Sequence, residues 1–283
     1  MPSGDEPLKA RSLWLFGVMW LAGAAGAAAQ QPMVVPAPTQ PEFFSRGDFH
    51  LNAAWIRTVP ALRPAGRSVA DQRWDWDTFW GGSIDLVDYV AGRVGVVIDY
   101  EAVLGHEFQP FDPNQGSYTL EVSGSARMGR NAELVAVFHH VSRHLGDRAK
   151  VRNPVGFNEL GGRLLRRIGS GRSTLDIDAE GGGIVERAYV DYTWLADLNL
   201  MARVPVSDRV GFFAHAAGHL VGVNGAVPDR ITQSGGLVEA GVRIRGTGGA
   251  MELFGGFEKR LDADPLDRQP QHWVLAGFRL LSR

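Results

Sequence analysis

Apolar and polar residues alternate along most of the chain after Asp48. Alternation with a period of two is typical of a β-strand, because successive side chains point to opposite faces. In the segment 131–143, for example, Leu134, Ala136 and Phe138 share one face. The pattern predicts twelve strands, at residues 48–58, 78–91, 93–106, 117–128, 131–143, 157–168, 172–180, 189–204, 209–223, 234–246, 249–260 and 272–282.

The predicted connections fall into two classes that alternate along the chain. Those after the even-numbered strands are tight, at Gly92, 129–130, 169–171, 205–208 and 247–248. Those after the odd-numbered strands are long and polar, at 59–77, 107–116, 144–156, 181–188, 224–233 and 261–271. Short turns at one end and long loops at the other are typical of outer-membrane barrels, whose long loops face outside the cell. A soluble pair of sheets has no reason to sort its connections in this way.

The sequence therefore predicts an all-β fold, a transmembrane antiparallel up-and-down β-barrel of about 12 strands over residues 45–283. One face of each strand is apolar and the other carries charge, which indicates a lipid-facing exterior and a polar interior. Aromatic residues near strand ends are expected to form the two interfacial girdles, and they are Trp55, Phe79, Trp80, Tyr118, Tyr192, Trp194 and Trp273. Polar residues on the inner face are expected to form a salt-bridged plug or to line a narrow pore, and they are Asp99, Glu101, Arg127, Arg163, Arg203, His215, His219, Arg243 and Arg245.

The first residues have the organisation of an export signal. Lys9 and Arg11 precede the apolar run 13–21, and the small residues 27–29 follow as a cleavage site. The sequence predicts a signal peptide at 1–29 and a Pro-rich flexible leader at 30–44. The expected location is the cell outer membrane.

Composition narrows the possible chemistry. There is no cysteine, so disulfides, thiol nucleophiles and cysteine zinc sites are excluded. The formal net charge is −2, with no broad basic surface of the kind that binds nucleic acid. The expected partners are outer-membrane lipids and a surface or periplasmic protein, and the sequence carries no signal for an oligomeric state. No cofactor is expected.

The strand 131–143 ends in a polar cluster that a plain barrel strand does not need. His140 and Ser142 follow the apolar row in phase, so they are predicted to face lipid at the outer end of the strand. A one-residue bulge at His139 and His140 would reverse that phase. His139 and Arg143 are predicted to face the interior.

The His-x-Ser spacing resembles that of outer-membrane phospholipase A and of the lipid A 3-O-deacylase. The resemblance implies that His140 is a general base and Ser142 a nucleophile. It also implies an orienting Asn or Glu on the next strand, for which Asn153, Asn158 and Glu159 are the nearest candidates. The chain departs from the His-x-Ser-Asn pattern of those families, because Arg143 follows Ser142.

A second resemblance covers the same region. The run V-F-H-H-V-S-R-H-L-G-D-R, followed by N-E-L-G-G-R-L-L-R-R, resembles the S-S-H-L-G-D-E-F signature of a family of uncharacterised bacterial outer-membrane proteins. Ser142, His144 and Asp147 match this signature, whereas Val141 and Arg148 differ from it. This resemblance implies a surface barrel without a known reaction.

His144 and Asp147 are expected to cap the turn at the start of the loop, as an Asp beside a Gly commonly does. Together with His139 they offer an alternative metal ligand set, but without a second spaced group of ligands no metal site is predicted. Three functions follow from the sequence. The first is a structural or surface-interaction barrel, and the alternatives are a lipid hydrolase with a Ser-His pair at the extracellular rim or a narrow pore.

Overall fold

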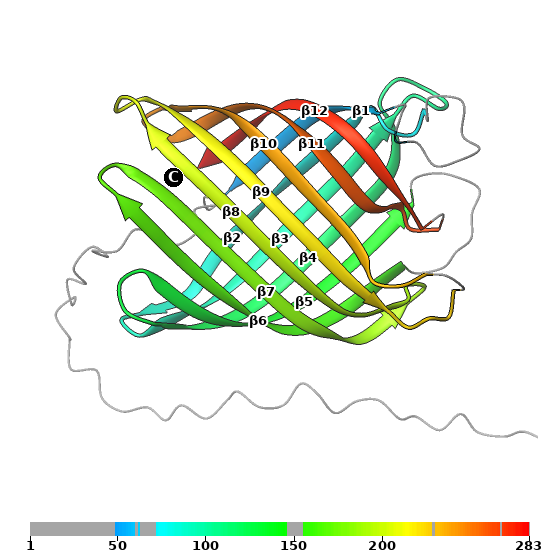
Figure 1. The fold of residues 1–283 in the computed structure, drawn as a ribbon, viewed down its shortest axis with the longest axis horizontal. Coiled ribbons are helices and arrows are strands. Elements are labelled where there is room, and N and C mark those ends of the chain that lie inside the picture. Colours follow the sequence, from blue (N-terminus) through cyan, green and yellow to red (C-terminus); the bar gives the residue numbers. More distant parts are fainter. Residues whose placement is uncertain are drawn as a thin grey trace, which may run out of the picture. The chain divides into compact units, whose positions relative to one another are not determined.

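The computed structural model describes residues 49–59, 62, 72–145, 155–227, 230–266 and 268–282. Within these residues the chain forms a closed barrel of twelve antiparallel strands (Figure 1). No helix in these ranges is long and apolar enough to cross a membrane. The strands are β1 (His50–Thr58), β2 (Trp76–Tyr89), β3 (Gly92–Gly105), β4 (Asp112–Arg127), β5 (Ala132–Leu145), β6 (Val155–Ser170), β7 (Ser173–Ala188), β8 (Tyr192–Pro205), β9 (Val210–Val223), β10 (Gln233–Arg245), β11 (Gly249–Asp264) and β12 (Gln269–Ser282).

Each strand pairs with its neighbours in sequence, and β1 closes the barrel by pairing with β12. The main-chain nitrogen of Ser282 donates to the carbonyl of Phe49 at 2.8 Å, so β12 ends where β1 begins. The strands run obliquely, with tight turns at one end and the longer connections at the other (Figure 1). Closure leaves no unpaired sheet edge, which is the condition for a sheet to sit in lipid. The predicted fold class is confirmed.

Several predicted loops are shorter than expected. β7 extends to Ala188, so the predicted loop 181–188 is strand and the connection is 189–191. Residues 181–183 are glycines, which have no side chain, so the alternation of apolar and polar residues is interrupted there. The run nonetheless pairs with β6 in regular register, up to residue 159. Likewise β4 begins at Asp112 inside the predicted loop 107–116, and β11 continues to Asp264 inside the predicted loop 261–271. The predicted signal peptide and leader lie outside the described residues.

The outer face is apolar, as predicted. Leu134, Leu160 and Val238 are each more than half exposed on it. Three of the seven predicted girdle aromatics instead point inward. Trp273 is fully buried, and Phe79 stacks on the buried His50 with ring centroids 5.0 Å apart. Both have an exposed outward neighbour, Val274 and Trp80 respectively, and adjacent strand residues cannot share a face.

Tyr192 is the third predicted girdle aromatic that points inward, and a β-bulge causes this orientation. The β8–β9 register shifts between Tyr192 and Trp194, so the two aromatics no longer share a face. Tyr192 is 4% exposed, and its hydroxyl donates to Asp262 at 2.6 Å. Trp194 stays on the outer face, 40% exposed.

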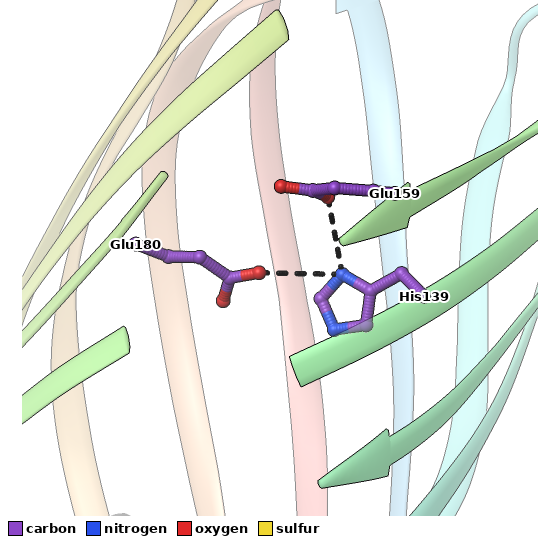
Figure 2. A group of neighbouring side chains, drawn as sticks. All are labelled: His139, Glu159 and Glu180. Carbon is purple, nitrogen blue, oxygen red and sulfur yellow. Dashed lines mark ion pairs between the residues drawn. The ribbon is translucent and has the colours of Figure 1, made fainter. Parts of the chain in front are cut away.

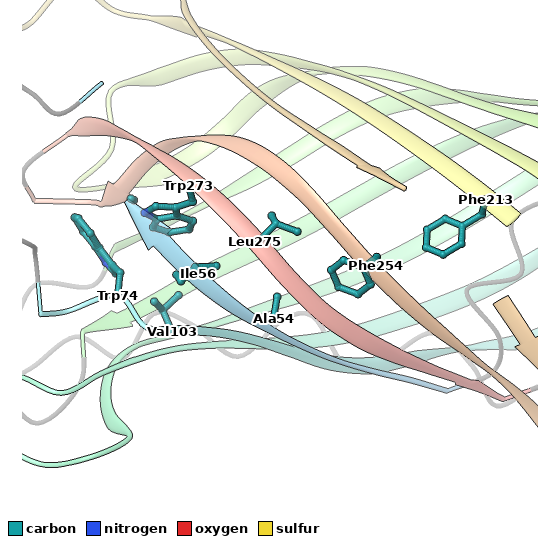
Figure 3. Close-up of a cluster of buried hydrophobic side chains, with 9 residues drawn as sticks. Ala54, Ile56, Trp74, Val103, Phe213, Phe254, Trp273 and Leu275 are labelled. Carbon is teal, nitrogen blue, oxygen red and sulfur yellow. The ribbon is translucent and has the colours of Figure 1, made fainter. Parts of the chain in front are cut away.

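Part of the interior is apolar, which the predicted polar lining did not include. One buried cluster gathers side chains from β1, β3, β9, β11 and β12 and from the segment before β2 (Figure 3). Burying a Val, Leu, Ile or Phe side chain contributes about 1.5–3 kcal/mol to the free energy of unfolding. The barrel thus has a packed core of its own, formed by Ala54, Ile56, Trp74, Val103, Phe213, Phe254, Ala263, Trp273 and Leu275.

Candidate functional site

The polar cluster of β5 continues the outward row of that strand. The pairing of β5 with β4 and with β6 shows no register shift, so the bulge considered at His139 and His140 is not present. His140 and His144 are exposed on the outer face, with Ser142 between them in the same phase. His139 and Arg143 point into the barrel, where their partners lie. His140, Ser142 and His144 form a polar row near the end of β5 that leads into a long connection.

His140 is held by a chain of hydrogen bonds across two further strands. Its Nδ1 lies 2.7 Å from Oδ1 of Asn158 on β6. Nδ2 of Asn158 donates in turn to Oε2 of Glu186 on β7, at 2.7 Å. A carboxylate only accepts hydrogen bonds, so the amide nitrogen of Asn158 must face Glu186 and its oxygen must face His140. Nδ1 of His140 therefore carries the hydrogen, and Nε2 is the basic nitrogen.

A β-bulge in β7 brings Glu186 to this face. Asn158 pairs with Glu186, whereas the next residue, Glu159, pairs with Ile184, so Val185 is the extra residue. A bulge places two consecutive side chains on nearly the same side of a sheet. Val185 and Glu186 are accordingly both exposed. Sequence reasoning missed Glu186 because it assigned residues 181–188 to a loop.

Ser142 contacts a different histidine from the one predicted. Its Oγ lies 3.0 Å from Nε2 of His144, and the ring of His144 packs against that of Tyr118 with centroids 4.8 Å apart. His144 was expected to cap a loop, but β5 extends to Leu145, so His144 lies on the strand. Ser142 is therefore flanked by two histidines on one face, each two residues away.

A shallow depression of about 170 Å³ opens beside this row. Gly156 lies opposite Ser142 in the sheet register, and a Cβ there would come within 2.6 Å of the carbonyl oxygen of Val141. A larger residue would therefore not fit beside the Ser142 hydroxyl. The depression is smaller than a pocket for a whole ligand, so it suits one group of a larger molecule. It is lined by His140, Ser142, Val155, Gly156, Phe157, Asn158, Glu186, Arg187 and Ala188.

Glu159, one of the predicted orienting residues, does not contact His140. It is 1% exposed, points into the barrel and faces Nδ1 of His139 at 3.4 Å. Because side chains alternate, residues 158 and 159 face opposite sides of the sheet, and the register assigns Asn158 to His140. Asn153 and Asp147 lie outside the described residues.

The residues predicted for the lumen lie on the inner face, where nearly all pair with an acidic or basic side chain of another strand. Asp176, for example, is fully buried and meets both Arg167 and Arg203. Arg245 differs, since it lines a small cavity beside Arg243 at the tight-turn end. The other pairs are Asp99 with His50, Glu101 with Arg260, Arg127 with Asp88, Arg163 with Glu121 and Glu180, Arg243 with Glu252, His215 with Glu239, and His219 with Asp197.

Sequence reasoning did not predict how these lumen residues pair. Glu121, Asp176 and Glu252 are nearly or fully buried, and each accepts from an arginine on a neighbouring strand or on the next strand but one. Their inward phase was readable from the alternation. Which arginine each one meets depends on the register between strands, and a single strand does not contain that information.

Solved structures with a similar fold are outer-membrane barrels. An active-site mutant of outer membrane phospholipase A from Escherichia coli, with Ala in place of Asn, has a TM-score of 0.52 and 11% identity, and the match covers 87% of this chain and 94% of that one. A second structure of outer membrane phospholipase A from Escherichia coli has a TM-score of 0.50 and 10% identity, covering 85% of this chain and 98% of that one. At such identities the likeness concerns the fold. No protein-family model matches the sequence, and no curated protein matches it significantly.

Proposed function

We propose that this protein is an outer-membrane hydrolase that releases acyl chains from membrane lipids, with Ser142 as nucleophile and His140 as general base. The observation that carries the proposal is the 2.7 Å hydrogen bond between His140 and Asn158, which is itself held by Glu186. A histidine that acts as a general base needs a fixed ring orientation and tautomer, and the hydrogen bonds through Asn158 to Glu186 supply both. A structural barrel has no need of such a chain on its outer face.

The position of the row favours a lipid substrate. The row continues the apolar side chains of β5, Leu134, Ala136 and Phe138, toward the end of the strand. A barrel with this exterior is expected in the outer membrane, with the row at the level of the lipid headgroups. Ester bonds between headgroup and acyl chain lie at that depth. The expected partner is therefore a lipid of the surrounding leaflet, reached without entering the lumen.

The reaction would proceed as an acyl transfer. Oγ of Ser142 attacks the ester carbonyl as Nε2 of His140 takes its proton. The proton passes to the leaving alcohol, and an acyl-Ser142 ester remains. A water molecule, deprotonated by the same nitrogen, then attacks that ester and releases the fatty acid, and the proton returns from the imidazole to Oγ of Ser142. Asn158 and Glu186 act as positioning residues, because they touch the base and its support rather than the ester.

His144 has a different role in this proposal. The Ser142 hydroxyl contacts His144 in the structure, and His140 lies on the same face at the same sequence separation. Rotation about the Cα–Cβ bond of Ser142 would turn its hydroxyl from one histidine toward the other. We assign the base to His140 because its ring has a polar orienting partner, whereas His144 is supported by the ring of Tyr118.

The E. coli structures are compatible with a lipid hydrolase, but they do not identify the base. The protein they contain is named a phospholipase, and an asparagine was replaced in its active-site mutant. Because the shared identity is only 11%, that likeness supports the fold, and the proposal rests on the side chains of this chain.

Covalent labelling tests the proposed nucleophile. A fluorophosphonate forms a bond from phosphorus to an activated serine oxygen and releases fluoride, and the serine proton passes to the base. We expect the refolded protein to gain one adduct, mapped by mass spectrometry to the peptide that contains Ser142. The variant Ser142→Ala should gain none, and Asn158→Ala should react more slowly. An adduct on another residue, or none on the wild type, would contradict the proposal.

A further inference from the structure

A second polar cluster lies inside the barrel, on the opposite face of β5 from His140. His139 on β5, Glu159 on β6 and Glu180 on β7 point toward one another (Figure 2). Nδ1 of His139 lies 3.4 Å from Oε2 of Glu159 and 3.3 Å from Oε1 of Glu180. One ligand atom from each residue lies within 4.8 Å of the other two. Three consecutive strands thus each direct one side chain that can bind a metal ion to the same point in the lumen.

The other ring nitrogen of His139 determines what faces that point. Nε2 lies 2.8 Å from Oε2 of Glu121. Because a carboxylate only accepts, Nε2 carries the hydrogen, and Nδ1 of a neutral ring offers its lone pair. Nδ1 and two carboxylate oxygens then face one another as three acceptors. Such an arrangement is unfavourable unless a positive charge lies among them, either a proton on Nδ1 or a bound metal ion.

The arginine nearby does not fill this position. Arg163 donates to Oε2 of Glu121 at 2.7 Å and to Oε2 of Glu180 at 2.6 Å. Its Nη2 lies 3.3 Å from Nε2 of His139, on the other side of the ring from Nδ1. Glu180 therefore uses one oxygen for Arg163 and turns the other, Oε1, toward His139.

The two glutamates also carry oxygens without a hydrogen-bond partner. These are Oε1 of Glu180 and Oε1 of Glu159, whose side chains are only 6% and 1% exposed. Buried polar atoms nearly always have a partner, so such atoms call for an explanation. The guanidinium of Arg163 is shared by the carboxylates of Glu121, Glu180 and Asp178, and Glu159 adds a fourth carboxylate to the cluster. An additional positive charge would account for both features.

The sequence makes room for this cluster. A Cβ at Gly182 would lie 2.3 Å from Oε1 of Glu159, and one at Gly161 would lie 3.2 Å from the same atom. Gly161 and Gly182 are paired in the sheet. The paired glycines therefore leave the space in which the Glu159 carboxylate lies against the barrel wall.

We propose that His139, Glu159 and Glu180 bind a divalent transition metal ion, and that Zn²⁺ matches the site best. Tetrahedral zinc with bonds of the usual length holds its ligand atoms about 3.3–3.5 Å apart, which agrees with the two separations from His139 Nδ1. One imidazole and two carboxylates form a donor set that zinc accepts. Glu121 orients the histidine through its other nitrogen, as carboxylates do for metal-binding histidines. The ion would join β5, β6 and β7 in the lumen.

Zinc titration of the refolded, untagged full chain in detergent micelles tests this proposal directly. After treatment with a chelator and its removal, we expect saturable binding of one Zn²⁺ by calorimetry and a higher unfolding temperature in its presence. Co²⁺ should give visible absorption bands that a histidine ligand shifts. His139→Gln and Glu180→Gln should abolish both effects, and Glu121→Gln should weaken the affinity about 10- to 100-fold.

Two controls separate this site from other histidines. His215→Gln removes another lumen His–Glu pair, with Nδ1 3.3 Å from Glu239, and should bind Zn²⁺ like the wild type. The double variant His140→Gln/His144→Gln removes the exposed histidines and should also bind normally. Heat-modified gel mobility verifies that each variant has folded. No saturable binding by the wild type would overturn the proposal and indicate a protonated imidazole between the two glutamates. Equal binding by His139→Gln would also overturn it, because the ion would then lie at other residues. Neither result bears on the proposed hydrolase, since the test measures no acyl release.

Discussion

Arg143 reaches across the barrel and donates to the main-chain carbonyl of Asp262, 3.2 Å away. Arg143 is on β5 and Asp262 is on β11, which lie on opposite walls in the closed strand order. Asp262 has a φ of 45° beside a register shift in β11, and this left-handed conformation reorients its peptide groups. Its carboxylate also accepts from Tyr192 and Arg230. The end of the lumen near the longer connections is therefore crossed by side chains.

This crossing bears on the possibility of a pore. Arg260 of β11 also pairs with Glu101 of β3 and Asp77 of β2, beyond the seam between β12 and β1. We expect the wild type to show no steady conductance in planar lipid bilayers. The double variant Arg143→Ala/Arg260→Ala removes both crossings and should show channel openings. Steady conductance of the wild type, equal to that of the variant, would contradict a closed lumen.

The buried pairs of the interior should matter for stability. Asp176 is fully buried between Arg167 and Arg203, so Asp176→Ala leaves two guanidinium groups without their shared partner. We expect a loss of about 3–5 kcal/mol in the free energy of unfolding, measured by urea titration of the barrel in lipid vesicles. Asp208→Ala is the matched control, because its pair with Arg172 is exposed, and it should change stability little. Equal effects of the two variants would argue against this view of the lumen.

The supports of His140 should affect turnover more than substrate binding. Asn158→Ala leaves the ring of His140 without its partner and should remove part of the 10²- to 10⁴-fold contribution of a general base, mainly as a lower kcat. Glu186→Gln keeps the shape and should cost less. Asn199→Ala, which changes an asparagine beside an interior cavity, is the control and should have wild-type rates. An unchanged kcat in Asn158→Ala would show that Asn158 does not position the base.

The alternation of residues was enough to predict the barrel, its closure and the outward phase of His140 and Ser142. It failed where glycines or bulges interrupt it. The run 181–183 concealed the second half of β7, and the bulge at Val185 that exposes Glu186 leaves no mark in the sequence. Tyr192 was misplaced for the same kind of reason, because a bulge turns it inward.

The partners in the candidate site depend on properties that one strand does not encode. Asn158 and Glu159 are adjacent, and only the pairing of β6 with β5 decides which of them meets His140. The contact of Ser142 with His144 rather than His140 is set by a side-chain rotation. The cluster of His139, Glu159 and Glu180 similarly requires the register of three strands at once.

The most direct test of the central claim is release of fatty acid from phospholipid vesicles that contain the refolded protein. The account predicts steady release by the wild type, loss of release in Ser142→Ala and in His140→Gln, and retention of most of it in His144→Gln. All variants should fold, since these side chains lie on the outer face. Equal release by the wild type and Ser142→Ala, or no release by the wild type, would contradict the claim that this row is a catalytic site.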